Sequence, residues 1–148
     1  MTVTTNILLC SSADLWIPGS SCTSAACNAH NKYDHTASST SAFVPNNKLS
    51  IRYGDGSSST GDVYTETVSG TSGLLLSSDL AHRYPITVAG VIADQQTIGV
   101  ANTLSSDWTD DPMDGMLGMG FQAISQLKST PFFQTVRGTS LASNIRYI

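Results

Sequence analysis

Residues 12–18 of this 148-residue chain read Ser-Ala-Asp-Leu-Trp-Ile-Pro, and residues 114–120 read Asp-Gly-Met-Leu-Gly-Met-Gly. In each segment a short apolar run follows an aspartate and is bounded by a proline or a glycine. Short apolar runs between turn-forming residues are typical of buried β-strands. The two segments therefore predict strands at 15–17 and 116–119.

The rest of the chain carries further strand signals and few helix signals. Ten of the eleven acidic residues are Asp, and Ser and Thr together make up 39 of the 148 residues, whereas helices favour Glu, Lys and Ala. Strands are predicted at 43–44, 49–53, 61–68, 86–93 and 96–101, and short helices at 121–127 and 131–136. The Asp-Gly pair at 55–56 predicts an exposed, mobile hairpin turn. Together these signals indicate an all-β fold with one or two short helices.

Charge and apolar run length exclude two classes of partner. The chain has 7 Lys and Arg against 11 Asp and Glu, a formal net charge of -4, and its basic residues are scattered singly. Nucleic acids and anionic membrane surfaces are bound by basic stripes, which this pattern lacks. The apolar run at 74–76 is far shorter than the roughly 20 residues that cross a bilayer. We therefore expect neither a nucleic-acid partner nor a membrane partner.

The three cysteines admit two interpretations. Cys22 and Cys27 are close enough in sequence to form a disulfide, and Cys10 is left over. Alternatively, both cysteines could bind zinc together with His30 and His35, although the wide spacing fits poorly with structural zinc sites. The spacing favours the disulfide, and we expect no metal and no cofactor. The first eleven residues lack a basic segment and a long apolar run, so no signal peptide is predicted.

Several motifs occur in an order that is typical of one enzyme family. They are residues 12–18, Cys22 and Cys27, Tyr33-Asp34, Ser38-Ser39-Thr40, residues 51–57 and residues 114–121. This series resembles the N-terminal lobe of the pepsin-like aspartic endopeptidases, especially the secreted fungal ones. By this resemblance the lobe covers 12–136 with a probable insertion at 69–85, while 1–11 and 137–148 do not match.

The resemblance implies an incomplete lobe of a two-lobed β-barrel protease. In that family each lobe supplies one Asp from an Asp-Thr/Ser-Gly loop, and the two carboxyls share a proton and activate a water. Here Leu9 stands at the position of the catalytic Asp, followed by Cys10 and Ser11, and no Asp-Thr-Gly or Asp-Ser-Gly occurs anywhere in the sequence. We therefore expect no catalytic residue in this chain, which reads as truncated and inactive on its own. Asp14, five positions further on, is expected to be structural and partly exposed.

The same resemblance assigns substrate-binding residues. Tyr53 matches the flap tyrosine, whose hydroxyl reaches the tryptophan matched by Trp16, although cross-strand packing would also explain it. Asp55 at the hairpin tip either contacts substrate or serves only the turn. Trp108 either lines the first specificity pocket or packs in the core. The substrate-binding set is completed by Gly54, and the residues expected to support the site are Ser12, Trp16, Asp114, Gly115, Leu117 and Gly118.

Two functions remain open at this point. One is an aspartic-type endopeptidase acting on peptides or proteins outside the cell as a monomer, of which this chain is an inactive part. The other is a non-catalytic module that binds peptides without cutting them. A self-dimerising protease would need its own Asp-Thr/Ser-Gly motif and is set aside.

Overall fold

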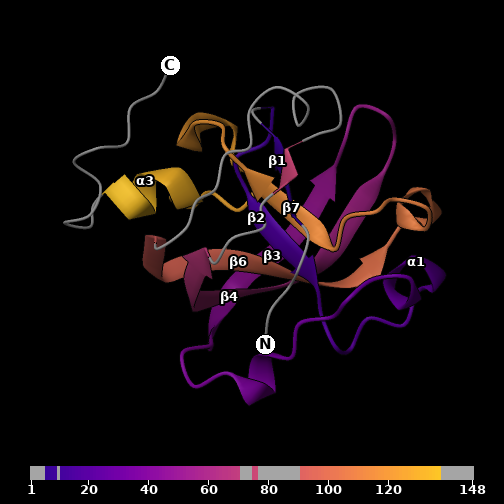
Figure 1. Cartoon of the computed structure of the whole chain (residues 1–148), viewed down its shortest axis with the longest axis horizontal. Coiled ribbons are helices and arrows are strands. Elements are labelled where there is room, and N and C mark those ends of the chain that lie inside the picture. Colours follow the sequence, from indigo (N-terminus) through magenta and orange to yellow (C-terminus); the bar gives the residue numbers. More distant parts are fainter. Residues whose placement is uncertain (1–5, 10, 71–74, 77–90, 138–148) are drawn as a thin grey trace.

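A computed structural model describes residues 6–9, 11–70, 75–76 and 91–137 of the chain (Figure 1). In order the elements are β1 (Asn6–Leu9), β2 (Leu15–Pro18), α1 (Ala25–Asn28), η1 (His35–Ala37), β3 (Ala42–Arg52), β4 (Ser58–Gly70), β5 (Leu75–Leu76), β6 (Val91–Leu104), η2 (Ser106–Trp108), β7 (Gly115–Gly118), η3 (Gln122–Ile124) and α3 (Phe132–Arg137), where η marks 3-10 helices. The all-β class with short helices is confirmed. No helix among these residues is long and apolar enough to cross a membrane.

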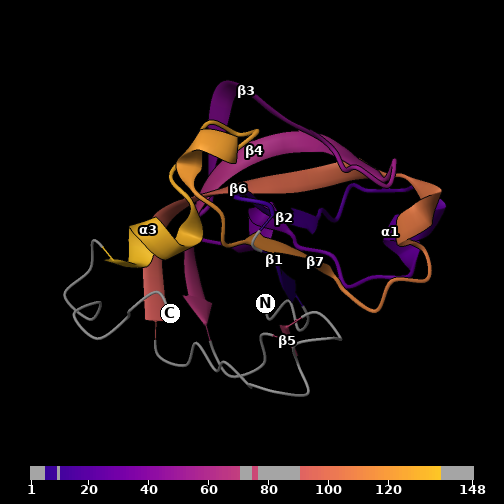
Figure 2. The ribbon, with the colours of Figure 1, turned by 90° about the horizontal axis from the view of Figure 1, so that it is seen from above.

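The strands form one sheet in the order β3-β4-β6-β2-β7-β1-β5. Figure 2 shows the long strands β3, β4 and β6 running along one side of the short strands β1, β2 and β7. The described outer strands β3 and β5 do not pair with each other, so the closed barrel expected from the resemblance is not what the structure shows. The sheet bends over itself but stays open, because closing a barrel requires the two outer strands to be joined by hydrogen bonds.

Strand β7 lies between β1 and β2, although it follows them by about a hundred residues in the sequence. It runs parallel to β1, with Leu9 opposite Gly118, and antiparallel to β2, with Trp16 opposite Met116. The chain between β1 and β2 therefore wraps around the end of β7. Two backbone bonds close this wrap, from the Gly118 amide to the Asp14 carbonyl (2.9 Å) and from the Gly120 amide to the Ser12 carbonyl (2.7 Å).

Asp14, which lies between β1 and β2, binds residues 125–127 of the segment that follows β7. Its carboxylate accepts hydrogen bonds from the Ser125 hydroxyl (2.6 Å) and from the backbone amides of Gln126 (2.7 Å) and Leu127 (3.3 Å). The residue is only 3% exposed, so the expectation of a partly exposed Asp14 is wrong. A carboxylate can be buried here because three donors from the turn after η3 replace its hydration.

The long strands correct several predicted boundaries. The predicted strands 43–44 and 49–53 belong to the single strand β3, whose register with β4 shifts between Phe43 and Lys48, where Asn46 has a φ of 63°. The predicted strand 96–101 and the last residues of the predicted strand 86–93 likewise fall on β6, with Gln95 at a φ of 52°, whereas 86–90 lie outside the described residues. A bulge interrupts the pattern of alternating side chains without ending the strand, which explains why each strand was predicted in pieces. The predicted insertion at 69–85, the tail at 137–148, His82 and Cys10 lie wholly or largely outside the described residues.

Of the two short helices predicted, one is present and the other is only a 3-10 turn. Helix α3 confirms the helix predicted at 131–136, with Pro131 just before its first residue. The segment predicted as a helix at 121–127 forms only the 3-10 turn η3, because its residues 125–127 turn to donate to Asp14. The short helix α1 was not predicted.

Strand β2 is buried along its whole length and divides the core into two clusters. Trp16 points to one side of the sheet, and Leu15 and Ile17 point to the other, as expected for alternating side chains. The first cluster contains Trp16, Cys22, Ala26, Cys27, Leu49, Ile51, Val63, Ala101, Leu104, Trp108, Met113, Met116 and Leu127. The second contains Leu15, Ile17, Tyr33, Ala93, Ile98, Val100, Leu117, Phe132 and Val136. The predicted functional residues Trp16 and Trp108 thus belong to one cluster.

Replacing Gly118 should break the wrap around β7. A Cβ added at Gly118 would lie 2.5 Å from backbone atoms of Ala13 and Asp14, which cannot move without opening β2 and β7. We expect Gly118→Ala to lower the free energy of unfolding by about 2–3 kcal/mol, the range of overpacked core positions. Urea denaturation measures this free energy. Gly54→Ala is the matched control, since its Cβ would meet nothing within 4 Å. Equal stability of the two variants would contradict the close approach.

A second prediction concerns Glu66, the only glutamate of the chain. It is 6% exposed on β4 and accepts hydrogen bonds from the hydroxyls of Tyr33 and Thr40 and from the Thr67 amide (2.8 Å). Burial raises the pKa of the Glu66 carboxyl, but these hydrogen bonds outweigh burial and leave that pKa below its ordinary value. A carboxyl with a lower pKa in the folded state adds stability above its unfolded pKa, and this stability is lost as the pH falls through the folded pKa.

Glu66→Gln should therefore be less stable than the natural chain at neutral pH, and this difference should shrink as the pH falls below about 4. Thermal unfolding measured from neutral to acidic pH gives the two curves. Asp110→Asn, at an exposed position, is the control and should follow the natural chain throughout. A Glu66→Gln curve that stays parallel to that of the natural chain would show that ionised Glu66 does not stabilise the fold.

Candidate functional site

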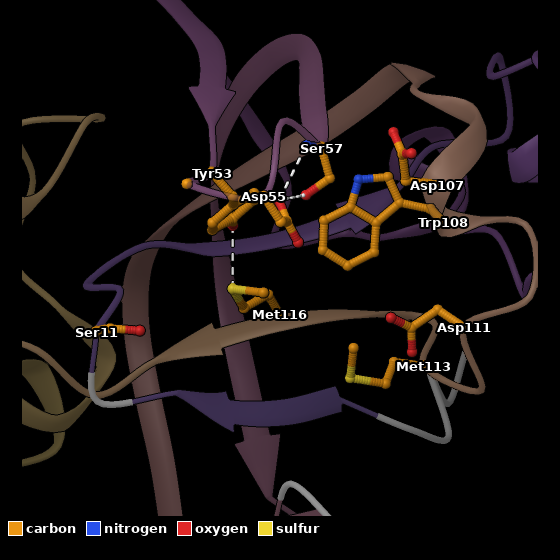
Figure 3. A pocket seen from close by; sticks show the side chains of 10 residues that line it. Ser11, Tyr53, Asp55, Ser57, Asp107, Trp108, Asp111, Met113 and Met116 are labelled. Atoms are coloured by element: carbon orange, nitrogen blue, oxygen red, sulfur yellow. Dashed lines mark hydrogen bonds between the residues drawn. The ribbon is translucent and has the colours of Figure 1, made fainter.

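A pocket of about 370 Å³ opens between the β3–β4 hairpin, η2 and β7 (Figure 3). It is lined by Ser11, Tyr53, Gly54, Asp55, Ser57, Asp107, Trp108, Asp111, Met113 and Met116. All four residues predicted to bind substrate are among them. The pocket combines an aromatic and thioether surface with carboxylates, a mixture of apolar lining and few polar groups that is typical of ligand-binding pockets.

The hairpin turn at residues 53–57 is held by its own backbone and by Asp55. The Tyr53 amide donates to the Ser57 carbonyl (2.9 Å), the Gly56 amide donates to the Tyr53 carbonyl (3.0 Å), and Gly56 has a φ of 97°. Asp55 accepts from the Ser57 amide (2.9 Å) and hydroxyl (2.7 Å), and these bonds lower the pKa of its carboxyl. The hairpin prediction is confirmed. Asp55 serves the turn and also lines the pocket, so its two proposed roles are compatible.

Tyr53 connects the hairpin to the core. The indole nitrogen of Trp16 donates to the Tyr53 hydroxyl (2.7 Å), which lies 3.0 Å from the sulfur of Met116 (Figure 3). Burial raises the pKa of Tyr53, and hydrogen bonds with Trp16 and Ser12 oppose this effect. The ring is partly buried rather than exposed at a mobile tip, because its hydroxyl offers the buried indole an acceptor. The bond expected between Tyr53 and Trp16 is present.

Trp108 belongs both to the core and to the pocket. It is 7% exposed, its ring makes edge contacts with Trp16 (5.1 Å between centroids) and Tyr53 (5.6 Å), and its indole nitrogen donates to the Ser58 carbonyl (3.2 Å). Trp108 therefore packs in the core and also lines this pocket, while its place in a substrate-specificity pocket stays a prediction. The three aromatic residues form a continuous wall from β2 to the hairpin.

Asp114 supports the site from behind the pocket. Its carboxylate accepts from the Asn31 amide (2.9 Å) and side chain (2.8 Å), and the His30 imidazole lies 3.7 Å away. Gly115, Leu117 and Gly118 follow it on the fully buried strand β7. Ser12 and Trp16 lie on the neighbouring wrap and on β2. The residues predicted to support the site are thus gathered around β7.

The disulfide prediction is confirmed, since Cys22 and Cys27 are joined with their Cα atoms 5.9 Å apart. The two histidines of the zinc alternative lie in different environments. His30 contacts Trp108 and Asp114, whereas His35 stacks on Tyr64 with 4.6 Å between ring centroids. Within the ranges that the structure describes, no three metal-binding side chains converge.

Sequence reasoning missed six residues of the pocket. Ser11, Ser57, Asp107, Asp111, Met113 and Met116 were not predicted to line it. Met113 and Met116 flank Asp114 and could have been found from the buried strand pattern there. Asp107 and Asp111 place two carboxylates beside Trp108 in the pocket lining. With Asp55 they make the charged part of the lining entirely acidic.

Comparison with known proteins finds a family model and several relatives that this chain resembles. The family model described as eukaryotic aspartyl protease matches residues 5–79 and 80–145. The chain is 38% identical over 82% of its length to an aspartic protease of Phaffia rhodozyma, 36% identical over 86% to penicillopepsin-1 of Penicillium roqueforti, and 33% identical over 80% to endothiapepsin of Cryphonectria parasitica. It covers 25%, 28% and 24% of the lengths of these relatives, or about a quarter.

Removing the Tyr53 hydroxyl should expose how much the pocket depends on it. Tyr53→Phe leaves the buried Trp16 indole without its acceptor, which costs about 1–3 kcal/mol of unfolding free energy. We also expect faster hydrogen exchange at the Trp16 indole, measured by NMR. Tyr64→Phe, on a ring that stacks against His35, is the control and should change neither quantity. If Tyr53→Phe behaves like this control, the bond does not hold the hairpin.

Proposed function

The chain belongs to the eukaryotic aspartyl protease family, and on this premise we propose that it carries one half of a peptide-binding cleft of an aspartic-type endopeptidase but does not cleave peptides by itself. The observation that supports the binding half is the pocket under a hairpin that Tyr53 ties to Trp16. Tyr53 fixes the start of the turn, and the exposed Gly54 and Asp55 beyond it line the pocket, where they would contact a bound peptide.

The proposal of inactivity rests on the missing acid pair. Cleavage by this chemistry needs two carboxyls about 3 Å apart that share one proton, so that one activates water while the other donates to the peptide carbonyl. Leu9 occupies the position of one of these acids, and the printed sequence contains no Asp-Thr/Ser-Gly motif. The backbone of Leu9 pairs with Gly118, at the end of β1 where the wrap begins.

The other buried carboxylates are committed to the fold. Asp14 accepts three hydrogen bonds from residues 125–127, and Asp114 accepts two from Asn31. A carboxylate that is saturated by backbone and side-chain donors is a poor base for a water molecule. We therefore assign neither Asp14 nor Asp114 a role in catalysis.

For a longer protein built on the family plan we propose a second lobe that supplies the other half of the cleft and an acid of the pair. Its substrates would be peptides or proteins, and it would act as a monomer outside the cell. Within it, residues 12–136 would form the N-terminal lobe, with the insertion at 69–85. The Cys22–Cys27 disulfide supports an extracellular location, because such bonds persist in oxidising compartments.

A second candidate function is peptide binding without cleavage by this chain alone. The pocket favours it, since the hairpin, Trp108 and Met116 of this chain already line an open pocket of about 370 Å³. An inactive part of a protease that needs its other half for binding would have no measurable peptide affinity. The two candidates therefore differ in affinity and agree on the absence of cleavage.

The test is a digestion of acid-unfolded haemoglobin at about pH 3–5, the range in which a carboxyl pair keeps one proton. We expect no fragments from this chain. Digestion that a statine-type inhibitor blocks would overturn the proposal of inactivity. In parallel, binding of the same inhibitor is measured by calorimetry. Binding that Trp108→Ala abolishes and Tyr64→Ala leaves unchanged would support the peptide-binding module, and no binding by any variant would refute it.

A further inference from the structure

His30 joins the wall of the pocket to the strand behind it. It lies two residues after α1, and its side chain is only 4% exposed. The Nε2 atom is 2.7 Å from the carbonyl oxygen of Trp108, and the Nδ1 atom is 3.7 Å from Oδ1 of Asp114. Trp108 lines the pocket, and Asp114 immediately precedes β7, which contributes Met116 to the same pocket.

Both groups that the imidazole faces can only accept protons. A carbonyl oxygen and a carboxylate have no hydrogen to donate, and a neutral imidazole has one N–H while an imidazolium has two. The neutral ring can therefore donate to only one of the two groups, the Trp108 carbonyl or the Asp114 carboxylate. Its other nitrogen carries a lone pair, which then faces the oxygen of the second group without a hydrogen between them. The protonated ring can donate toward both, and the bond to the carboxylate then joins opposite charges.

We propose that His30 is a positioning residue that holds Trp108 against the pocket in its protonated form. The inference rests on the proposed peptide-binding function. It means that the pocket wall is assembled in acid and loosens as His30 loses its proton toward neutral pH. Histidine is suited to this role because its charge changes between about pH 5 and 8.

The charged groups nearest to His30 are mostly carboxylates. Asp114 faces the ring directly. The η2 segment, which packs against α1, and the turn after it carry Asp107, Asp110 and Asp111 and no basic residue. The Lys32 ammonium, on the same loop as His30, is bound to the carbonyl of Cys22 (2.7 Å) and to the side chain of Asn28 (2.9 Å).

The loop that carries His30 is a firm support for Trp108. The Cys22–Cys27 disulfide closes the loop around α1, and Ser24 within it accepts a hydrogen bond from the Leu104 amide (3.2 Å), just before η2. On the C-terminal side of His30, the two hydrogen bonds from Asn31 to Asp114 anchor the loop to the residue before β7. Because both flanks of His30 are anchored, a change in its bond to Trp108 must be taken up by η2 and the pocket wall.

The experiment uses the full chain between about pH 5 and 7.5, where aspartates stay ionised and histidines titrate. NMR follows the three imidazoles and the Trp108 indole N–H. We expect the Trp108 resonance to shift with the same midpoint as His30. The shift should vanish in His30→Gln, whose amide can still donate to the Trp108 carbonyl but carries no charge. It should persist in His35→Gln and His82→Gln.

A binding measurement gives the second readout. Affinity for a statine-type inhibitor should be about tenfold higher at pH 5 than at pH 7.5 in the natural chain, the size of one charge-assisted hydrogen bond. In His30→Gln the ratio should fall to about one, whereas a purely structural role would weaken binding equally at both pH values. An unchanged ratio in this variant would overturn the inference.

The readouts separate the inference from the function on which it rests. If the inhibitor binds at neither pH, the peptide-binding function fails, and the Trp108 resonance alone decides the role of His30. If His30→Gln does not fold, the natural chain still decides it. A Trp108 resonance that does not move while His30 titrates would refute the coupling.

Discussion

The passage of β7 between β1 and β2 is the constraint on which the rest of the structure depends. It requires the backbone of Gly118 to approach Ala13 and Asp14 so closely that a Cβ would lie 2.5 Å from them. The same wrap is closed by the Asp14 carboxylate, which takes three donors from the turn after η3. Once β7 is seated, Met116 lies opposite Trp16 in the sheet and lines the pocket.

Several buried polar side chains of this domain form hydrogen bonds at the boundary between the core and the pocket. The Trp16 indole, buried in the central strand, finds its acceptor in the hairpin tyrosine, so the requirement to satisfy a buried donor also positions the hairpin. His30 and Asn31 connect the disulfide loop to Asp114 in the same manner. Stability and pocket shape therefore share residues, and substitutions at Trp16, Tyr53 or Asp114 act on both.

Sequence reasoning reached the strands with the clearest apolar pattern, the hairpin turn, the final helix and the disulfide. It divided β3 and β6 into pieces, because bulges at Asn46 and Gln95 reverse the side-chain alternation while the hydrogen bonds continue. It placed Asp14 near the surface, since an isolated carboxylate in a sequence shows nothing of the donors that arrive from residues 125–127. Six of the ten residues that line the pocket escaped it, since they come from segments far apart in the sequence, from Ser11 to Met116.

The sequence by itself determined the all-β class, the order of the family motifs and the lack of an Asp-Thr/Ser-Gly motif in these 148 residues, because each is a matter of which residue follows which. The tertiary structure alone decided that Asp14 and Asp114 are saturated acceptors, that Trp108 serves core and pocket together, and that His30 stands between two acceptors. These properties depend on contacts between residues 78 to 113 positions apart. The local sequence pattern predicts which backbone conformation a segment adopts and which residues are buried. The hydrogen bonds of a side chain depend instead on the groups that the folded chain places opposite it.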